Sequence, residues 1–148
     1  MNKKFLVAVV FSLPAFSSAG QCQVDVASSD QMRFDNSVIE VSKSCPAFNL
    51  TLNNSGTIPK TVMGHNIVIV KKSDADSVAR DAIAAGAGSE YVKAGDTRII
   101  AHTKMLGGGE KDTIAIDPAK LQEGEEYLFF CSFPGRRVMM SGSWLVKN

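Results

Sequence analysis

Residues 127–144 read Tyr-Leu-Phe-Phe-Cys-Ser-Phe-Pro-Gly-Arg-Arg-Val-Met-Met-Ser-Gly-Ser-Trp. The aromatic and apolar start of this stretch is typical of a buried β-strand, which leads directly into Cys131. Pro134 and Gly135 predict a tight turn in the loop that follows, and Met140 comes nine residues after the cysteine. A thiolate and a thioether on one short loop are soft ligands of the kind that copper selects. The stretch therefore predicts a core strand and a candidate metal-binding loop.

Short apolar runs separated by turn residues recur along the chain. Residues 48–52 alternate apolar and polar, whereas 67–70 is continuously apolar, as expected for a strand buried on both faces. We therefore predict an all-β sandwich or barrel of about eight strands, at 22–26, 38–41, 48–52, 67–70, 98–101, 112–116, 127–130 and 143–146.

One alanine-rich segment, residues 74–85, departs from the strand pattern. Val78, Ala82 and Ile83 share one side of a helix built on this segment, and Gly86 follows it as a stop signal. We expect a short helical flap inserted between two strands and not a second domain.

The N-terminus has the order of a secretory leader. Lys3 and Lys4 precede the apolar run 5–11, and Ser17-Ser18-Ala19 is a small-residue cleavage signal. The alternative is a buried first strand, but a core strand would not carry this order of charges. The predicted organisation is a signal peptide at 1–19, cleaved near Ala19/Gly20, and one exported domain at 20–148.

Charge and motif content argue against several functions. Lys3 and Lys4 are the only charged side chains of the leader, so 14 basic and 15 acidic residues remain after it. This balance argues against nucleic-acid binding and against a polybasic membrane anchor. Gly107-Gly108-Gly109 lacks the lysine and the strand-to-helix context of a phosphate-binding loop. Because no histidine is placed as a base for Cys131 either, we expect no enzyme.

Three cysteines in an exported chain leave one unpaired. Cys22 and Cys45 lie with the early candidate strands, whereas Cys131 lies in the aromatic loop. We predict a Cys22–Cys45 disulfide, worth roughly 3 kcal/mol in the chain-entropy model. Cys131 is then the free thiol, either a metal ligand or an inert buried cysteine.

An imidazole for the candidate site can come from Gly64-His65-Asn66. A lone histidine here would be interpreted as a core residue, but Cys131 and Met140 favour a ligand role. Gly64 would allow close approach of the backbone to a metal. His102 lies at a polar strand exit and is expected at the surface.

Eight segments together resemble the azurins, the single-domain bacterial cupredoxins, with spacing kept from Cys22 through Gly142. They are Cys22-Gln-Val-Asp, Asp30-Gln-Met-Arg-Phe, Lys43-Ser-Cys45, Val62-Met-Gly-His-Asn66, Ile100-Ala-His-Thr-Lys104, Gly109-Glu-Lys-Asp112, Glu123-Gly-Glu-Glu-Tyr127 and Phe129-Phe-Cys-Ser-Phe-Pro-Gly135.

The resemblance implies an eight-stranded Greek-key sandwich with a helical flap, a Cys22–Cys45 disulfide and one copper ion that shuttles single electrons in the periplasm. By position, the ligands would be the Gly64 carbonyl, His65, the Cys131 thiolate and a weak axial Met140. Asn66 and Phe133 would stiffen the ligand loops. The apolar patch facing a redox partner protein would comprise Ile58, Val62, Met63, Pro134 and Val138.

Arg136 stands where azurins carry a second histidine ligand. A guanidinium stays protonated and has no lone pair for a metal. Water, a small anion or a partner side chain could fill that position. Our first hypothesis is a periplasmic single-electron carrier with an altered copper site, for which Arg136 and Arg137 favour an acidic partner. The alternative is a redox-silent cupredoxin that binds or handles Cu(I) through His65, Cys131 and Met140.

Overall fold

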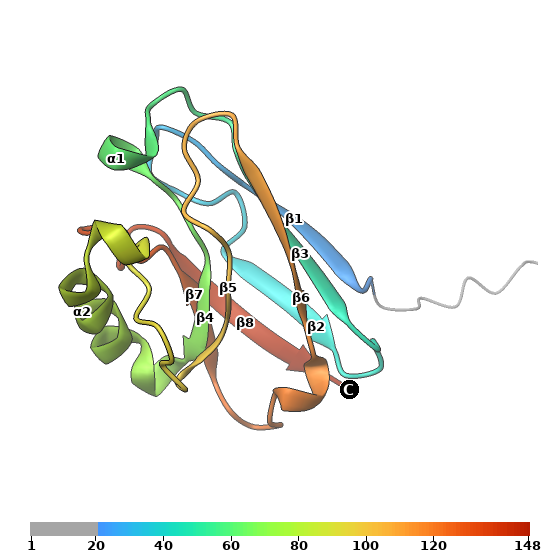
Figure 1. The fold of residues 1–148 in the computed structure, drawn as a ribbon. Helices are drawn as coiled ribbons and strands as arrows, with labels where there is room; N and C mark the ends of the chain where they lie inside the picture. The colour runs from blue at the N-terminus through green and yellow to red at the C-terminus, as the bar shows by residue number, and fades with distance from the viewer. Residues whose placement is uncertain (1–20) are drawn as a thin grey trace, which may run out of the picture.

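The protein is described here by a computed structural model that places residues 21–148, so the predicted signal peptide lies outside the described residues. Two β-sheets face one another (Figure 1). The three-stranded sheet has the order β1 (Gln23–Ser28), β3 (Phe48–Asn54), β6 (Lys111–Ile116). The five-stranded sheet has the order β2 (Val38–Ser42), β8 (Ser141–Lys147), β7 (Tyr127–Phe130), β4 (Val68–Lys71), β5 (Ile99–His102).

Pairing within the sheets combines two directions. β1 runs parallel to β3 and β2 runs parallel to β8, whereas the remaining neighbours are antiparallel. The predicted eight-stranded sandwich is confirmed. The shorter helical elements are α1 (Lys60–Met63), η1 (Lys72–Asp74), η2 (Ala87–Ser89) and η3 (Pro118–Lys120).

The main core lies between the sheets and follows the alternation of the sequence. On β3, Phe48, Leu50 and Leu52 are buried, and the residues between them face outward. The ring of Phe48 meets that of Trp144 edge-on, with centroids 5.5 Å apart, so β3 and β8 are joined across the two sheets. Such aromatic pairs contribute about 0.5–1.5 kcal/mol beyond the area they bury.

The predicted flap is helix α2 (Ala75–Ala85), which packs beside β4 and β7 (Figure 1). Its buried stripe is formed by Ala75, Val78, Ala79 and Ala82, and this cover explains why β4 is apolar on both faces. The expectation for Ile83 is wrong, since this side chain is 52% exposed. A helix turns about 100° per residue, so Ile83 is rotated away from the stripe that Ala82 continues.

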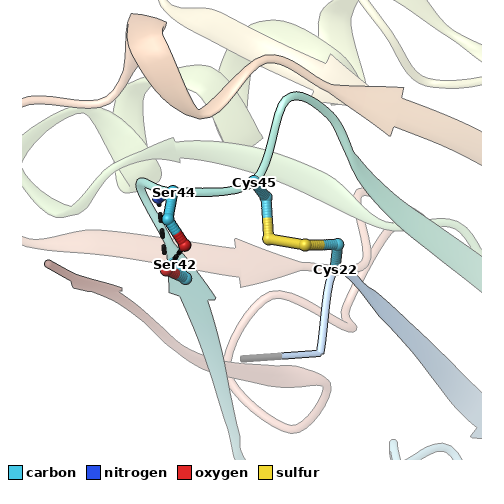
Figure 2. Close-up of a disulfide and its surroundings, with 4 residues drawn as sticks. All are labelled: Cys22, Ser42, Ser44 and Cys45. Carbon is cyan, nitrogen blue, oxygen red and sulfur yellow. Dashed lines mark hydrogen bonds between the residues drawn. A yellow bond between two sulfur atoms is a disulfide. The ribbon is translucent and has the colours of Figure 1, made fainter. Parts of the chain in front are cut away.

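The predicted disulfide joins Cys22 to Cys45, with Cα atoms 5.6 Å apart (Figure 2). It ties the start of β1 to the turn between β2 and β3. In the same turn, the hydroxyl groups of Ser42 and Ser44 lie 2.7 Å apart (Figure 2). Cys131 is free and buried. Within residues 21–148, no helix has the length and apolar character needed to span a bilayer.

Candidate metal centre

Two loops that are far apart in sequence are joined at one end of the sandwich by Asn66 and Ser132. The Asn66 side-chain amide donates to the Ser132 hydroxyl at 2.8 Å, and its oxygen accepts from the Ser132 backbone N–H at 2.8 Å. Both residues are buried. Asn66 therefore holds the loop after α1 against the loop after β7. Ser132 was not singled out in the sequence, because only its long-range partner gives it a role.

Gly64 connects α1 to the histidine, and it is a glycine because there is no room for a side chain. A Cβ atom here would lie 2.7 Å from the Lys60 carbonyl oxygen and 2.8 Å from the Met105 sulfur. The Gly64 carbonyl oxygen lies 3.8 Å from Cys131 Sγ. The carbonyl and the thiol thus belong to one site.

His65 is fully buried, and its ring orientation is fixed by the backbone. Nε2 lies 2.9 Å from the Ser29 carbonyl oxygen. Because a carbonyl can only accept, Nε2 carries the hydrogen and Nδ1 of the neutral ring keeps its lone pair. Burial lowers the pKa of His65, with a further lowering by the charge of Arg136, so the ring is neutral at pH 7. Ser29 acts through its carbonyl, which no sequence motif reveals.

Nδ1 of His65 is buried and has no hydrogen-bond partner among the described residues. Unpartnered buried polar atoms are uncommon and call for an explanation. His65 follows Gly64, whose carbonyl oxygen lies 3.8 Å from the Cys131 thiol, so this free lone pair is suited to a metal ion.

Cys131 lies at the end of β7 with no exposed surface. Burial raises the pKa of its thiol to about 11, and the backbone N–H groups of Asn66 and Phe133 and the charge of Arg136 offset part of that rise. Those N–H groups favour the thiolate, which is the metal-binding form. The metal-free protein therefore holds a protonated thiol in a place prepared for a thiolate.

Met140 closes the loop just before β8 and is fully buried. Its carbonyl accepts the Cys131 N–H at 2.9 Å, and its own N–H donates to the Arg136 carbonyl at 2.8 Å. The turn inside the loop is closed by the Arg136 N–H, which donates to the Phe133 carbonyl at 3.1 Å. Gly135 takes a φ of 79° there, with Pro134 before it, as the sequence predicted.

Arg136 lies over the Phe133 ring, with its guanidinium carbon 5.3 Å from the ring centroid. Phe133 also meets Tyr91 edge-on at 5.2 Å, so the ring is supported from a second side. The Nε atom of Arg136 is buried and has no hydrogen-bond partner in the described part of the chain. The Nε atom of Arg137 is in the same state, but its guanidinium group pairs with Asp76 on α2 at 3.1 Å and lies 5.1 Å from the Phe130 ring centroid.

These residues fit a copper ion in part. His65 Nδ1, the Cys131 sulfur, the Met140 sulfur and the Gly64 carbonyl are donors of the types found in blue-copper sites. Within residues 21–148 no group of three or more His, Cys, Asp or Glu side chains is placed to hold a metal, so a site here depends on methionine and backbone donors. Arg136 supplies no lone pair for a metal ion. His102 is exposed, as predicted.

Exposed apolar side chains lie on the loop and on α1. Val62 is 62% and Val138 84% exposed. Ile58, Met63 and Pro134 are half-buried. Met139 is 58% exposed. It was not predicted as a surface residue from the sequence, because only the adjacent Met140 was interpreted, as a ligand.

A two-sheet β-sandwich with cysteine, methionine and histidine donors at one end has the features of a mononuclear cupredoxin. Residues 20–147 match the family described as copper binding proteins, plastocyanin/azurin family. The chain belongs to that family. Azurin of Bordetella pertussis is 53% identical over 133 residues, which cover 90% of this chain and 87% of that protein.

Further relatives agree with the family. Azurin of Pseudomonas aeruginosa is 43% identical over 147 residues, 99% of each protein. A solved structure of the azurin Az-iso2 from Methylomonas sp. strain J superposes with a TM-score of 0.83 at 38% identity, covering 87% of this chain and all of that one. The expectation of a copper-binding electron-transfer family, and not an enzyme family, is confirmed at the level of the family.

Proposed function

We propose that the protein is an exported, periplasmic copper protein that passes single electrons between partners. His65 Nδ1, the Cys131 thiolate, Met140 and the Gly64 carbonyl would hold one copper ion, which when bound supplies a one-electron redox couple. The observation that carries the proposal is the buried and unpartnered Nδ1 of His65, the residue after Gly64, whose carbonyl oxygen lies 3.8 Å from the buried Cys131 thiol. The leader at 1–19 and the domain at 20–148 are part of the same proposal.

Neighbouring residues of the chain would hold the ligands in one arrangement for both oxidation states of copper. Ser29 fixes the His65 ring, and Asn66 fixes the two loops relative to one another. Because residues outside the ligand set restrain the ligands, the ligands move little when the copper ion gains or loses an electron. Small movements favour fast electron exchange. Cys131 loses one proton when the metal binds, because its thiol is protonated at neutral pH.

The partner would dock on the surface formed by Val62, Val138 and Met139. Arg136 has no carboxylate within salt-bridge distance among the described residues, so it adds an unneutralised positive charge beside that surface. We infer a transient redox partner with acidic groups around its docking face. Such encounters bury less than about 1,200 Å².

A second candidate is a redox-silent protein that binds Cu(I). The donors favour it: one thiolate, one thioether and one imidazole suit Cu(I), which tolerates low coordination. The two functions predict different results for one titration. An intense visible band that appears with Cu(II) and is lost in Cys131→Ser supports the electron carrier. Tight Cu(I) binding against a chromophoric chelator, with no colour from Cu(II), supports the second candidate. No binding of either ion excludes both.

A further inference from the structure

We propose that Arg136 makes this centre a receptor for a small monoanion, which binds the copper ion at the position that the arginine cannot fill and is held by the guanidinium group. The proposal rests on the copper binding proposed above, and it names a ligand for the same site.

The first support is the donor count. The loop keeps its closed geometry, with Cys131 hydrogen-bonded to Met140 and Met140 to Arg136, so the backbone still presents residue 136 at the site. The guanidinium group has hydrogen-bond donors only and no lone pair to offer a metal. A copper ion held by His65, Cys131 and Met140 therefore lacks one strong ligand, and an open position is where an outside ligand binds.

The second support is the state of Arg136. Its Nε is buried without a hydrogen-bond acceptor, and none of the described carboxylates forms an ion pair with it. Neighbouring Arg137 also has a buried Nε without a partner, but its guanidinium group forms an ion pair with Asp76, which Arg136 lacks. The ring of Phe133, two residues after Cys131, supports the guanidinium of Arg136 at 5.3 Å, and no described carboxylate neutralises that group.

The third support is charge balance. Cu(II), one thiolate and one guanidinium together leave an excess of two positive charges, whereas a neutral imidazole in place of the guanidinium leaves an excess of one. One bound monoanion restores that smaller excess. An anion between copper and Arg136 would be attracted by both.

Access and size define the ligand. Arg136 is half-buried, and the neighbouring Gly135, Val138 and Met139 are exposed, so a small solute can reach the loop from solvent. The ligand must coordinate copper and accept a hydrogen bond from a guanidinium. Chloride, azide and thiocyanate meet both requirements.

The test is a titration of the Cu(II)-loaded protein with sodium azide, followed by visible and electron paramagnetic resonance spectra. We expect a saturable change, with azide binding at least roughly tenfold weaker in Arg136→Leu, because a charge-assisted hydrogen bond is lost. Arg80→Leu, which removes an exposed arginine of α2, should bind azide as the parent does. Neutral imidazole should show the opposite order and bind Arg136→Leu at least as tightly as the parent.

The outcomes are separable. Copper spectra that do not respond to azide overturn the anion site and leave the copper function standing. Equal azide affinity in the parent and Arg136→Leu also overturns it, since the open position would then act without the arginine. If Arg136→Leu does not fold, Arg136→Lys takes its place. This variant keeps the positive charge beside the site. An azide affinity far below the imidazole affinity in this variant would contradict the proposal. A parent protein that binds no copper removes both proposals.

Discussion

The side chain of Asn66 makes two hydrogen bonds of 2.8 Å to Ser132, one to its hydroxyl and one to its backbone N–H. The two residues stand next to His65 and Cys131 in the sequence. This buried contact therefore fixes the position of the loop that carries His65 relative to the loop that carries Cys131.

Asn66→Ala should destabilise the metal-free protein by about 2–4 kcal/mol, because it leaves the Ser132 N–H and hydroxyl buried without partners. Urea unfolding followed by tryptophan fluorescence measures this. Asn53→Ala, at an exposed asparagine of β3, is the matched control and should change stability by no more than about 0.5 kcal/mol. Similar losses in the two variants would show that the loops are held by other contacts.

Arg136→His should convert the protein into an ordinary blue-copper carrier. The loop retains its turn and its closure onto Met140, so the change adds a nitrogen donor and removes a positive charge. We expect tighter Cu(II) binding, a strong visible band and faster electron exchange, with little change in the stability of the metal-free form.

The control for this conversion is Arg136→Gly with added imidazole, which should regain part of the colour by supplying the donor from solution. If both variants stay colourless, the loop differs from an azurin loop by more than one residue, and the Cu(I)-binding alternative gains support.

Met140→Leu should keep the visible band, weaken copper binding and shift the reduction potential, because an axial thioether tunes the site and the thiolate carries the colour. The two side chains are similar in volume, so the metal-free protein should lose less than about 1.5 kcal/mol of stability. Spectra and voltammetry of the two proteins side by side decide this. Loss of the band in Met140→Leu but not in Cys131→Ser would reverse the roles assigned to the two sulfur atoms.

A thiol count should give one equivalent in the unfolded, unreduced protein, because only Cys131 is free. In the native metal-free protein at pH 8, that thiol should react very slowly with iodoacetamide, since it is buried and its pKa is about 11. Three equivalents on unfolding would contradict the disulfide, and fast native alkylation would contradict the burial.

Acid should weaken the contact between α2 and the segment before β5. Hydrogen bonds from Arg98 lower the pKa values of Asp81 and Asp96. Carboxyl groups with lowered pKa values stabilise the fold above their unfolded pKa, near 4, and this stability is lost as the pH falls through the folded values. Urea midpoints of the parent should therefore fall between about pH 5 and pH 2 more steeply than those of Arg98→Leu. Parallel curves would mean that other carboxyl groups dominate acid unfolding.

Local patterns predicted most of the fold. The alternation in 48–52 and the continuous apolar run at 67–70 gave two central strands correctly, because burial on one face or two leaves a direct signal in the residues. Ile83 was placed wrongly because an apolar residue beside Ala82 does not reveal which side of a helix faces the core.

The site was less visible in the sequence. Its donor residues could be named from the spacing of Cys131 and Met140 and from resemblance. The groups that orient them could not: the Ser29 carbonyl and Ser132 act through long-range contacts of backbone and small side chains. Nor could the sequence place the Arg136 guanidinium on Phe133.

The hydrogen bond from the Cys131 N–H to the Met140 carbonyl closes the loop at its base. The pairing of β7 with β8 begins beside this bond, at Phe130 and Ser141, so the side chain of residue 136 takes no part in it. The azurin-like fold, the disulfide and the buried histidine are all present with an arginine at position 136, so the scaffold does not require a metal ligand at that place.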